Sequence, residues 1–415
     1  MEEITGILVD LFIIYAAAKI AGEIFVRLKQ PAIVGEVLAG VLIGPYTLGL
    51  VGSPDSDLTG LFGGDREAAE ESLNVVFDVI ATLGVIILLF FVGLETRLVD
   101  LLQVRNRALV AGVLGTILPF VAGFVFIWAT GRSDVESAFV ATALVATSVG
   151  ITARVLSELG VISSKEARII IGAAVIDDIL GLLLLAIVTS WGRDDVNVLE
   201  LTLTATAAAG FVAFAALIGT HAIRRYSIHL ERLHITNAPF AAAILLMLGL
   251  SALAGEIGLA AIIGAFLAGM MLAEAEEGFE LRRQAQGVYD FLVPFFFVII
   301  GMKVDPAAFD DAEILGIAVA ITVLAVVTKA AAGVIAAVGM PARSAAIIAA
   351  GRVPRGEVGF VVAGVGAGIG AVSEDMFAVV VFMSIATTLL APPVLTWLYS
   401  PRWSVVEAGE LTAEP

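Results

Sequence analysis

Cysteine is absent from the 415-residue chain. This absence excludes disulfides, thiol nucleophiles and cysteine-ligated metal sites, and it leaves the redox compartment open. Charge is also scarce, because only 15% of the residues are charged, against about 25% in soluble domains. The net charge of −17 and the lack of a basic stripe exclude a nucleic-acid-binding protein.

Apolar residues are abundant instead: they make up 60% of the chain, and the mean hydropathy is +1.02. Apolar segments recur from one end to the other without a long polar stretch. We therefore expect a polytopic membrane protein, with residues 1–415 forming one domain in the lipid bilayer. The chain starts Met1-Glu2-Glu3, without the basic region of a signal peptide, so we expect the first apolar segment in the mature protein.

The length of the apolar segments distinguishes helices from strands. A spanning helix needs about 20 apolar residues, whereas a barrel strand needs only about 9–11. Only helices and closed barrels satisfy backbone polar groups in lipid, and these segments are too long for barrel strands. The sequence predicts an all-α fold of about 13 transmembrane helices. The expected spans are 4–27, 31–50, 73–95, 107–130, 135–159, 165–191, 197–223, 237–255, 257–274, 287–303, 313–339, 341–371 and 375–399.

Lys and Arg residues are unevenly distributed between the predicted loops. One set of alternate loops contains most of them, and loops enriched in these residues are typically cytoplasmic. We therefore expect the N-terminus outside the cell membrane and the C-terminus, with the short tail 401–415, in the cytoplasm. The enriched set is Arg27, Lys29, Arg97, Arg105, Arg107, Lys165, Arg168, Arg224, Arg225, Arg232, Arg282, Arg283, Arg343 and Arg402.

Two pairs of segments resemble each other along the chain. Residues 35–44 resemble residues 263–271, and residues 89–95 resemble residues 296–302. Both pairs are seven predicted spans apart, and an odd offset would place the second copy upside down in the bilayer. Inverted repeats are common in transporters, whose substrate sites lie near the midplane on broken helices. The alternative is chance similarity between glycine-rich apolar helices.

The repeat makes the fifth and twelfth spans correspond, and both contain helix-breaking residues near their midpoints. The fifth has hydroxyl side chains, including Thr147 and Ser148, around Gly150. The twelfth reads Gly-Arg-Val-Pro-Arg-Gly-Glu over residues 351–357. Gly loosens the backbone, and Pro removes a donor and clashes with the preceding turn. We predict two discontinuous helices that cross at mid-membrane; the alternatives are an intact fifth helix and an ordinary proline kink in the twelfth.

Three residues of the twelfth span are expected to support this crossing, as Gly150 does in the fifth. Pro354 would interrupt the helix, and Arg355 and Glu357 could neutralise the ends of the half-helices. The alternative is a local salt bridge that Arg355 and Glu357 form with Arg352.

Two adjacent acids, Asp177 and Asp178, are predicted near the centre of the sixth span. A charge at the bilayer centre costs at least about 2.5–3.5 kcal/mol on insertion scales, so a functional explanation is favoured. Successive helix residues point in different directions. One carboxylate can therefore face a water-filled cavity while its neighbour faces a protein partner.

Lys329, midway along the eleventh span, is the candidate partner. Acids and a lysine that lie together titrate as a coupled group, and such a site can exchange a proton for a small cation. Carboxylate, hydroxyl and carbonyl oxygens are the ligands of hard cations. We expect Asp178, with Thr147, Ser148 or freed backbone carbonyls, to bind a small cation transiently in place of a proton. The alternative is a structural Asp–Lys pair that only ties two helices together.

Five motifs carry a resemblance to a known family, and they span most of the chain. The chain resembles the second family of monovalent cation:proton antiporters, which includes NapA-type sodium/proton and Kef-type potassium/proton exchangers. The motifs are Gln30–Gly40, Phe90–Glu95, Ala174–Asp178, Pro294–Phe297 and Val353–Glu357.

The resemblance implies a 13-helix homodimer with two parts that move against each other. Residues 1–103 and 236–305 would form the dimerisation or scaffold part. Residues 104–192 and 312–400 would form the core that transports ions, and residues 193–235 would supply a linking helix and a cytoplasmic loop.

The resemblance also implies roles for the charged residues in the membrane. Asp178 would be the ion-binding carboxylate, and Asp177 would be the partner of Lys329. In this family, the two acids with that lysine accompany electrogenic exchange of more than one proton per cation. No cofactor is implied.

These observations predict a secondary cation:proton antiporter rather than an enzyme. Its substrates would be H+ and Na+ (or Li+), with a role in pH homeostasis; the alternative is a Kef-type K+/H+ antiporter without the regulatory domain. Adjacent aspartates argue against an anion symporter on the same fold. An intramembrane aspartyl protease would need acids from separate helices. The remaining alternative is a channel-like or sensor protein, and saturable, pH-dependent exchange would exclude a channel.

Overall fold

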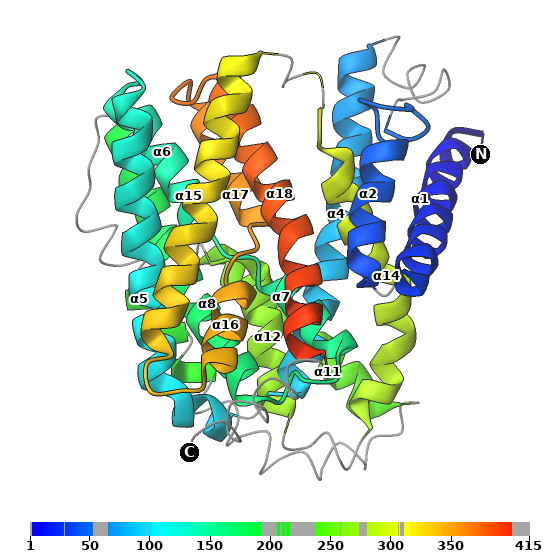
Figure 1. Cartoon of the computed structure of the whole chain (residues 1–415). Helices are drawn as coiled ribbons and strands as arrows, with labels where there is room; N and C mark the ends of the chain where they lie inside the picture. The colour runs from blue at the N-terminus through cyan, green and yellow to red at the C-terminus, as the bar shows by residue number, and fades with distance from the viewer. Residues whose placement is uncertain are drawn as a thin grey trace. The chain divides into compact units, whose positions relative to one another are not determined.

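The computed structural model is helical throughout the part of the chain that it describes, as the sequence predicts (Figure 1). The predicted seventh span, the linking region 193–235 and the tail 401–415 lie outside the described residues, except for a few positions between 206 and 215. The described residues are 2–28, 30–52, 65–96, 98–192, 206–207, 210–211, 213–215, 237–257, 259–273, 280–305, 307 and 311–400.

The chain folds into two compact units, and each unit is built from two separate stretches of sequence. The first unit contains residues 1–98 and 198–316, and the second contains residues 99–197 and 317–415. Each unit therefore takes one stretch from either half of the chain, as expected when an internal repeat contributes a copy to both. The transport roles assigned to such parts on the basis of the resemblance stay predictions.

The first unit contains two sets of helices that match in order and length. Each set has a long helix, a short helix of 12 residues and a second long helix. The helices are α1 (Glu2–Arg27), α2 (Ala32–Ile43), α4 (Arg66–Leu94), α11 (Ala238–Glu256), α12 (Ala261–Leu272) and α14 (Leu281–Met302).

The second unit also contains two matching sets of helices, but each of these sets includes an interrupted helix. In each set, two short helices stand between two long ones, and α6 packs on α8 as α16 packs on α18. Similarly, α7 packs on α8 as α17 packs on α18. The helices are α5 (Leu98–Ala129), α6 (Asp134–Val145), α7 (Val149–Glu158), α8 (Lys165–Gly192), α15 (Ala312–Ala336), α16 (Ala342–Gly351), α17 (Glu357–Gly368) and α18 (Glu374–Tyr399).

Eight helical segments among the described residues are long and apolar enough to span a membrane, and one of them is the α6–α7 run Asp134–Glu158. The short helices α2 and α12 differ from the predicted second and ninth spans, which run over 31–50 and 257–274. The apolar residues continue past the ends of these helices, so a window based on hydropathy overestimates the length of each helix. In α2, Pro31 precedes the first turn, and the chain leaves the helix at Gly44.

Helix α4 shows the opposite difference, because it begins at Arg66 rather than at residue 73. Its first turns are polar, so the hydropathy window omits them. The Asp65 side chain accepts a hydrogen bond from the Ala68 backbone N–H at 3.2 Å and caps the helix. Glu67 in the first turn also favours a helix N-terminus electrostatically.

Glycines bring the helices of the first unit into backbone contact in matching pairs. A Cβ atom at Gly40 in α2 would overlap the backbone of α14 near Gly301, and one at Gly301 would overlap α2 near Gly40. The same reciprocal relation joins Gly93 in α4 to Gly269 in α12. Each contact joins a segment of one similar pair to a segment of the other pair, so the repeat relates the two contacts to each other. This equivalence supports the internal repeat over chance similarity.

Replacing Gly269 by Ala is expected to destabilise the protein. The new Cβ would overlap the carbonyl oxygen of Phe90 in α4, and backbone cannot move aside as a flexible side chain does. Overpacking of this kind costs about 1–3 kcal/mol. Thermal unfolding in detergent measures the loss. The matched control is Gly249→Ala in α11, where the Cβ meets no atom within 4 Å; equal melting temperatures for the two variants would contradict this account of the contact.

Candidate ion-binding site

Helix α8 contains the two adjacent acids in its interior, within the second unit. Asp177 is fully buried, and Asp178 is 5% exposed. The backbone N–H groups around them are bonded within the helix and cannot compensate the carboxylates. A buried charge needs a partner, so the compensating groups must come from other helices.

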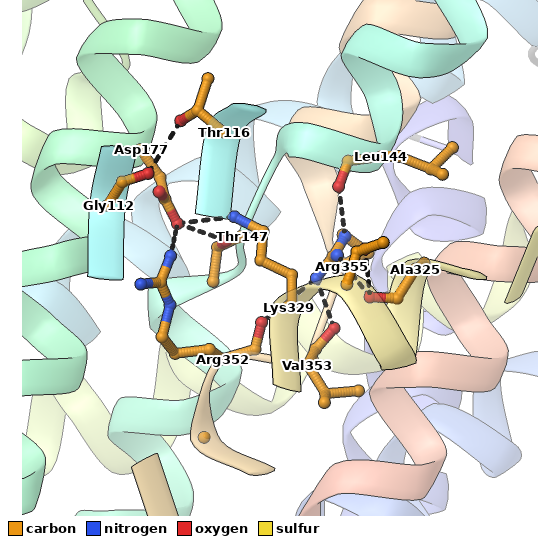
Figure 2. A network of polar contacts seen from close by, with 12 residues as sticks. Gly112, Thr116, Leu144, Thr147, Asp177, Ala325, Lys329, Arg352, Val353 and Arg355 are labelled. Atoms are coloured by element: carbon orange, nitrogen blue, oxygen red, sulfur yellow. Dashed lines mark hydrogen bonds and ion pairs between the residues drawn. The ribbon is translucent and has the colours of Figure 1, made fainter. Parts of the chain in front are cut away.

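Three donors converge on a single oxygen of Asp177 (Figure 2). The Oδ2 atom accepts hydrogen bonds from the Lys329 Nζ atom in α15 at 2.7 Å and from the Thr147 Oγ1 atom at 2.8 Å. The Arg352 Nη2 atom donates to the same oxygen at 2.7 Å. Lys329 and Arg352 are both fully buried. Asp177 therefore has two formal cations and one hydroxyl group as its partners.

The predicted partnership between Asp177 and Lys329 thus corresponds to a direct contact. Thr147 donates to Asp177, and the roles of Thr147 and Ser148 as cation ligands stay predictions. Ser148 is buried, and its backbone N–H donates to the Pro354 carbonyl at 2.9 Å. Thr147 and Ser148 therefore lie at the site, with Thr147 facing the first acid of the pair.

Both helices predicted to be broken are interrupted. Helix α6 ends at Val145 and α7 begins at Val149. Helix α16 ends at Gly351 and α17 begins at Glu357. The bond from Ser148 to the Pro354 carbonyl joins the two interruptions to each other. Backbone groups that leave a helix inside a membrane protein need such internal partners.

Two residues of the predicted breaks lie within helices instead. Gly150 belongs to the first turn of α7, not to the extended segment before it. Glu357 is the first residue of α17, and its side chain lies outside what the structure describes. Gly356 is at the predicted break, where a Cβ atom would approach the Ser148 Oγ atom to 2.6 Å. The close approach of the two interruptions therefore depends on Gly356.

Arg355 is fully buried and donates to backbone carbonyls rather than to an acid. Its Nε atom donates to the Leu144 carbonyl at 2.9 Å, at the end of α6 (Figure 2). Its Nη1 atom donates to the Val353 carbonyl at 2.6 Å, and its Nη2 atom donates to the Ala325 carbonyl at 3.2 Å. A cation at the C-terminal end of a helix is favourable, because the last carbonyls carry partial negative charge. Arg355 thus contacts a carbonyl at the end of α6, and its role in supporting a helix crossing stays a prediction.

Arg352 contacts a different partner from the one that its position in the sequence suggests. Its proximity to Arg355 and Glu357 suggests a local salt bridge, but its guanidinium group contacts Asp177 in α8. The sequence contains one indication that Arg352 pairs with an α8 acid, which is the balance of charges in the predicted membrane segments. Two buried carboxylates with a single lysine leave one negative charge uncompensated, and Arg352 is a nearby cation in a break that faces them.

Among the described residues, no group of three or more His, Asp or Glu side chains is arranged to hold a metal ion. Carboxylate, hydroxyl and carbonyl oxygens, as found around the α8 acids, are the ligands of hard cations in general.

The amino-acid sequence matches a known protein family over most of its length. Residues 12–400 match the family described as "Sodium/hydrogen exchanger, transmembrane". The High-affinity Na(+)/H(+) antiporter NhaS3 of Synechocystis is 38% identical, over 95% of this chain and 89% of that protein. The Na(+)/H(+)-K(+) antiporter GerN of Bacillus cereus is 34% identical, over 97% of this chain and 98% of that protein.

A solved structure supports the same fold. The sodium proton antiporter MjNhaP1 from Methanocaldococcus jannaschii superimposes with a TM-score of 0.66, over 99% of this chain and 100% of that one, at 16% sequence identity. The family match covers nearly the whole chain, including both halves of the repeat and every residue of the candidate site. The protein therefore belongs to the family of transmembrane sodium/hydrogen exchangers.

Proposed function

We propose that this protein is a secondary antiporter that exchanges Na+ for H+ across the cell membrane. The observation that carries the proposal is the pair of adjacent buried acids in α8, one of which is bound by Lys329 from another membrane helix. The two relatives named as antiporters, NhaS3 and GerN, align over nearly their whole length, which supports the same activity.

Asp178 is the proposed exchange site in this mechanism. A carboxylate holds either a proton or a cation, and a cation binds only to the deprotonated form. Each binding event therefore excludes the other, and the two substrates cross the membrane in opposite directions. Asp177 supports this site as a carboxylate with a fixed position, because three donors hold its Oδ2 atom.

The remaining cation ligands are proposed to come from the interruption of the fifth span. Thr147 donates its hydrogen to Asp177, which leaves the lone pairs of its Oγ1 atom available to a cation. The last carbonyls of α6 have no partner within that helix, and Arg355 occupies the one at Leu144. Hydroxyl and carbonyl oxygens complete the hard ligand set that Na+ prefers, together with Asp178 and Ser148.

The exchange is proposed to be electrogenic, with more than one proton per cation. Asp178 accounts for one proton, and Lys329, paired with Asp177, is proposed as the second group that gains and loses a proton in each cycle. The family resemblance supports the same stoichiometry. One pH unit supplies about 1.4 kcal/mol per proton. A potential of 100 mV adds about 2.3 kcal/mol per net charge. Either gradient can drive Na+ out of the cell.

Alternating access is proposed to expose the site to either side of the membrane in turn. Residues 104–192 and 312–400 would move as the ion-transport part, and residues 1–103 and 236–305 would form the scaffold and the homodimer contact. The charge asymmetry of the loops supports an external N-terminus and a cytoplasmic C-terminus.

Potassium is the second candidate cation, because the name of GerN includes K+. A Kef-type K+/H+ antiporter is the less favoured alternative, since the relatives named here share Na+ as a substrate. Exchange in proteoliposomes with Na+, Li+ and K+ in turn separates these cases.

Replacing Asp178 by Asn is expected to abolish Na+/H+ exchange in proteoliposomes. Asn is nearly isosteric but cannot hold a proton or offer a negative charge, so we expect a loss of at least about 100-fold, or about 2.7 kcal/mol. Dequenching of a pH-sensitive dye after addition of Na+ measures the exchange. The matched control is Asp134→Asn, an exposed acid at the start of α6. Full activity of the Asp178→Asn variant would exclude the assignment.

The apparent KM for Na+ is expected to fall as the pH rises. Protons and Na+ compete for one carboxylate, so each pH unit lowers KM by up to about tenfold while the site is mostly protonated. The KM becomes constant once the site is deprotonated. Initial rates over a series of pH values and Na+ concentrations measure this dependence, with choline in place of Na+ as the control. A KM that does not change with pH would contradict competition.

A further inference from the structure

We infer that Arg352 is a positioning residue that holds the Asp177 carboxylate independently of Lys329 and limits the affinity of the site for Na+. The inference rests on the proposed function, and it names a residue that controls the same site.

The Oδ2 atom of Asp177 contacts both cations at the same distance, 2.7 Å to Lys329 Nζ and 2.7 Å to Arg352 Nη2. All three side chains are fully buried. A buried carboxylate needs one opposite charge to offset its desolvation. Asp177 therefore has one cation more than it needs, and either of the two can compensate it alone.

The hydrogen bonds of Arg352 indicate that pairing with Asp177 is its main task. Its Nε and Nη1 atoms are buried and have no hydrogen-bond partner within the described part of the chain. Arg355, three residues later, instead distributes its donors over four backbone carbonyls. A buried arginine that supports the backbone would bond as Arg355 does, whereas Arg352 directs its described side-chain contact to the acid.

Helix α5 provides the space for this guanidinium group. A Cβ atom at Gly115 would overlap the Nη2 atom of Arg352, the atom that donates to Asp177. One turn earlier, Gly112 lies close to Ile176 in α8, the residue before Asp177. The two glycines therefore let α5 approach α8 and leave room for the arginine between the helices.

The charge balance gives the functional consequence. With Lys329 protonated, three cations (Lys329, Arg352 and Arg355) lie near two carboxylates, which leaves one positive charge in excess. A fixed positive charge close to the site weakens the binding of any cation to it. Arg352 thus prevents Na+ from binding too tightly, so that the ion is released after each transport step.

A double-variant cycle tests whether the two cations substitute for each other. Lys329→Gln, Arg352→Gln and the double variant are compared by thermal unfolding of the purified protein in detergent. We expect each single variant to keep most of the melting temperature, and the double variant to lose more than the sum of the two, because only then is Asp177 uncompensated. Additive losses, or a single Arg352→Gln loss as large as that of the double variant, would overturn the inference.

Transport kinetics test the effect on affinity, which a purely structural role would not produce. In proteoliposomes at a fixed pH, Arg352→Gln should lower the KM for Na+ by about fivefold, or about 1 kcal/mol. Gly115→Ala should lower it in the same direction, because the new methyl group moves the guanidinium group away from Asp177. Arg352→Lys, which retains the charge, should stay close to the wild-type value.

The matched control for the glycine variant is Gly364→Ala in α17, where a Cβ atom meets nothing within 4 Å. An unchanged or raised KM in Arg352→Gln, with only a lower maximal rate, would overturn the inference. If the wild-type protein exchanges no Na+ for H+, the proposed function fails. The unfolding cycle still decides the role of Arg352 in that case, since it requires no transport.

Discussion

The compensation of Asp177 inside the membrane is the interaction on which the rest of the site depends. Two adjacent carboxylates in one apolar helix are costly, and the helix itself supplies no donor for them. Lys329, Arg352 and Thr147 reach one oxygen of Asp177 from three other segments of the second unit. This arrangement fixes one acid of the pair, and it allows the other to serve as the exchangeable site in the proposed mechanism.

The helix interruptions are the means by which these groups reach the acid. An uninterrupted helix would place Thr147 and Arg352 on regular turns with bonded backbones. The interruptions instead bring both residues to Asp177, and Arg355 offsets the cost by donating to the carbonyls that the interruptions expose. In the first unit, by contrast, reciprocal glycine contacts such as Gly40 with Gly301 join continuous helices, backbone against backbone. One unit thus has interrupted helices with charges, and the other has close apolar packing.

The sequence predicts the helical fold, the repeat and the two interruptions, because hydropathy, glycine spacing and proline act locally along the chain. It also predicts the contact between Asp177 and Lys329, since each is a charge that needs a partner in lipid. The polar first turns of α4 are missed because their helix depends on a cap at Asp65 rather than on apolar residues. The contact of Arg352 is missed because it depends on which of several nearby charges the tertiary structure brings to α8.

The most direct test of the central claim is the release of protons when Na+ binds to the purified protein in a weakly buffered detergent solution. If one carboxylate exchanges the two ions, addition of NaCl must acidify the solution in a saturable manner, and choline chloride must not. The released protons should disappear when the starting pH is high enough for the site to be deprotonated. Saturable Na+ binding without any proton release at any starting pH would contradict the account.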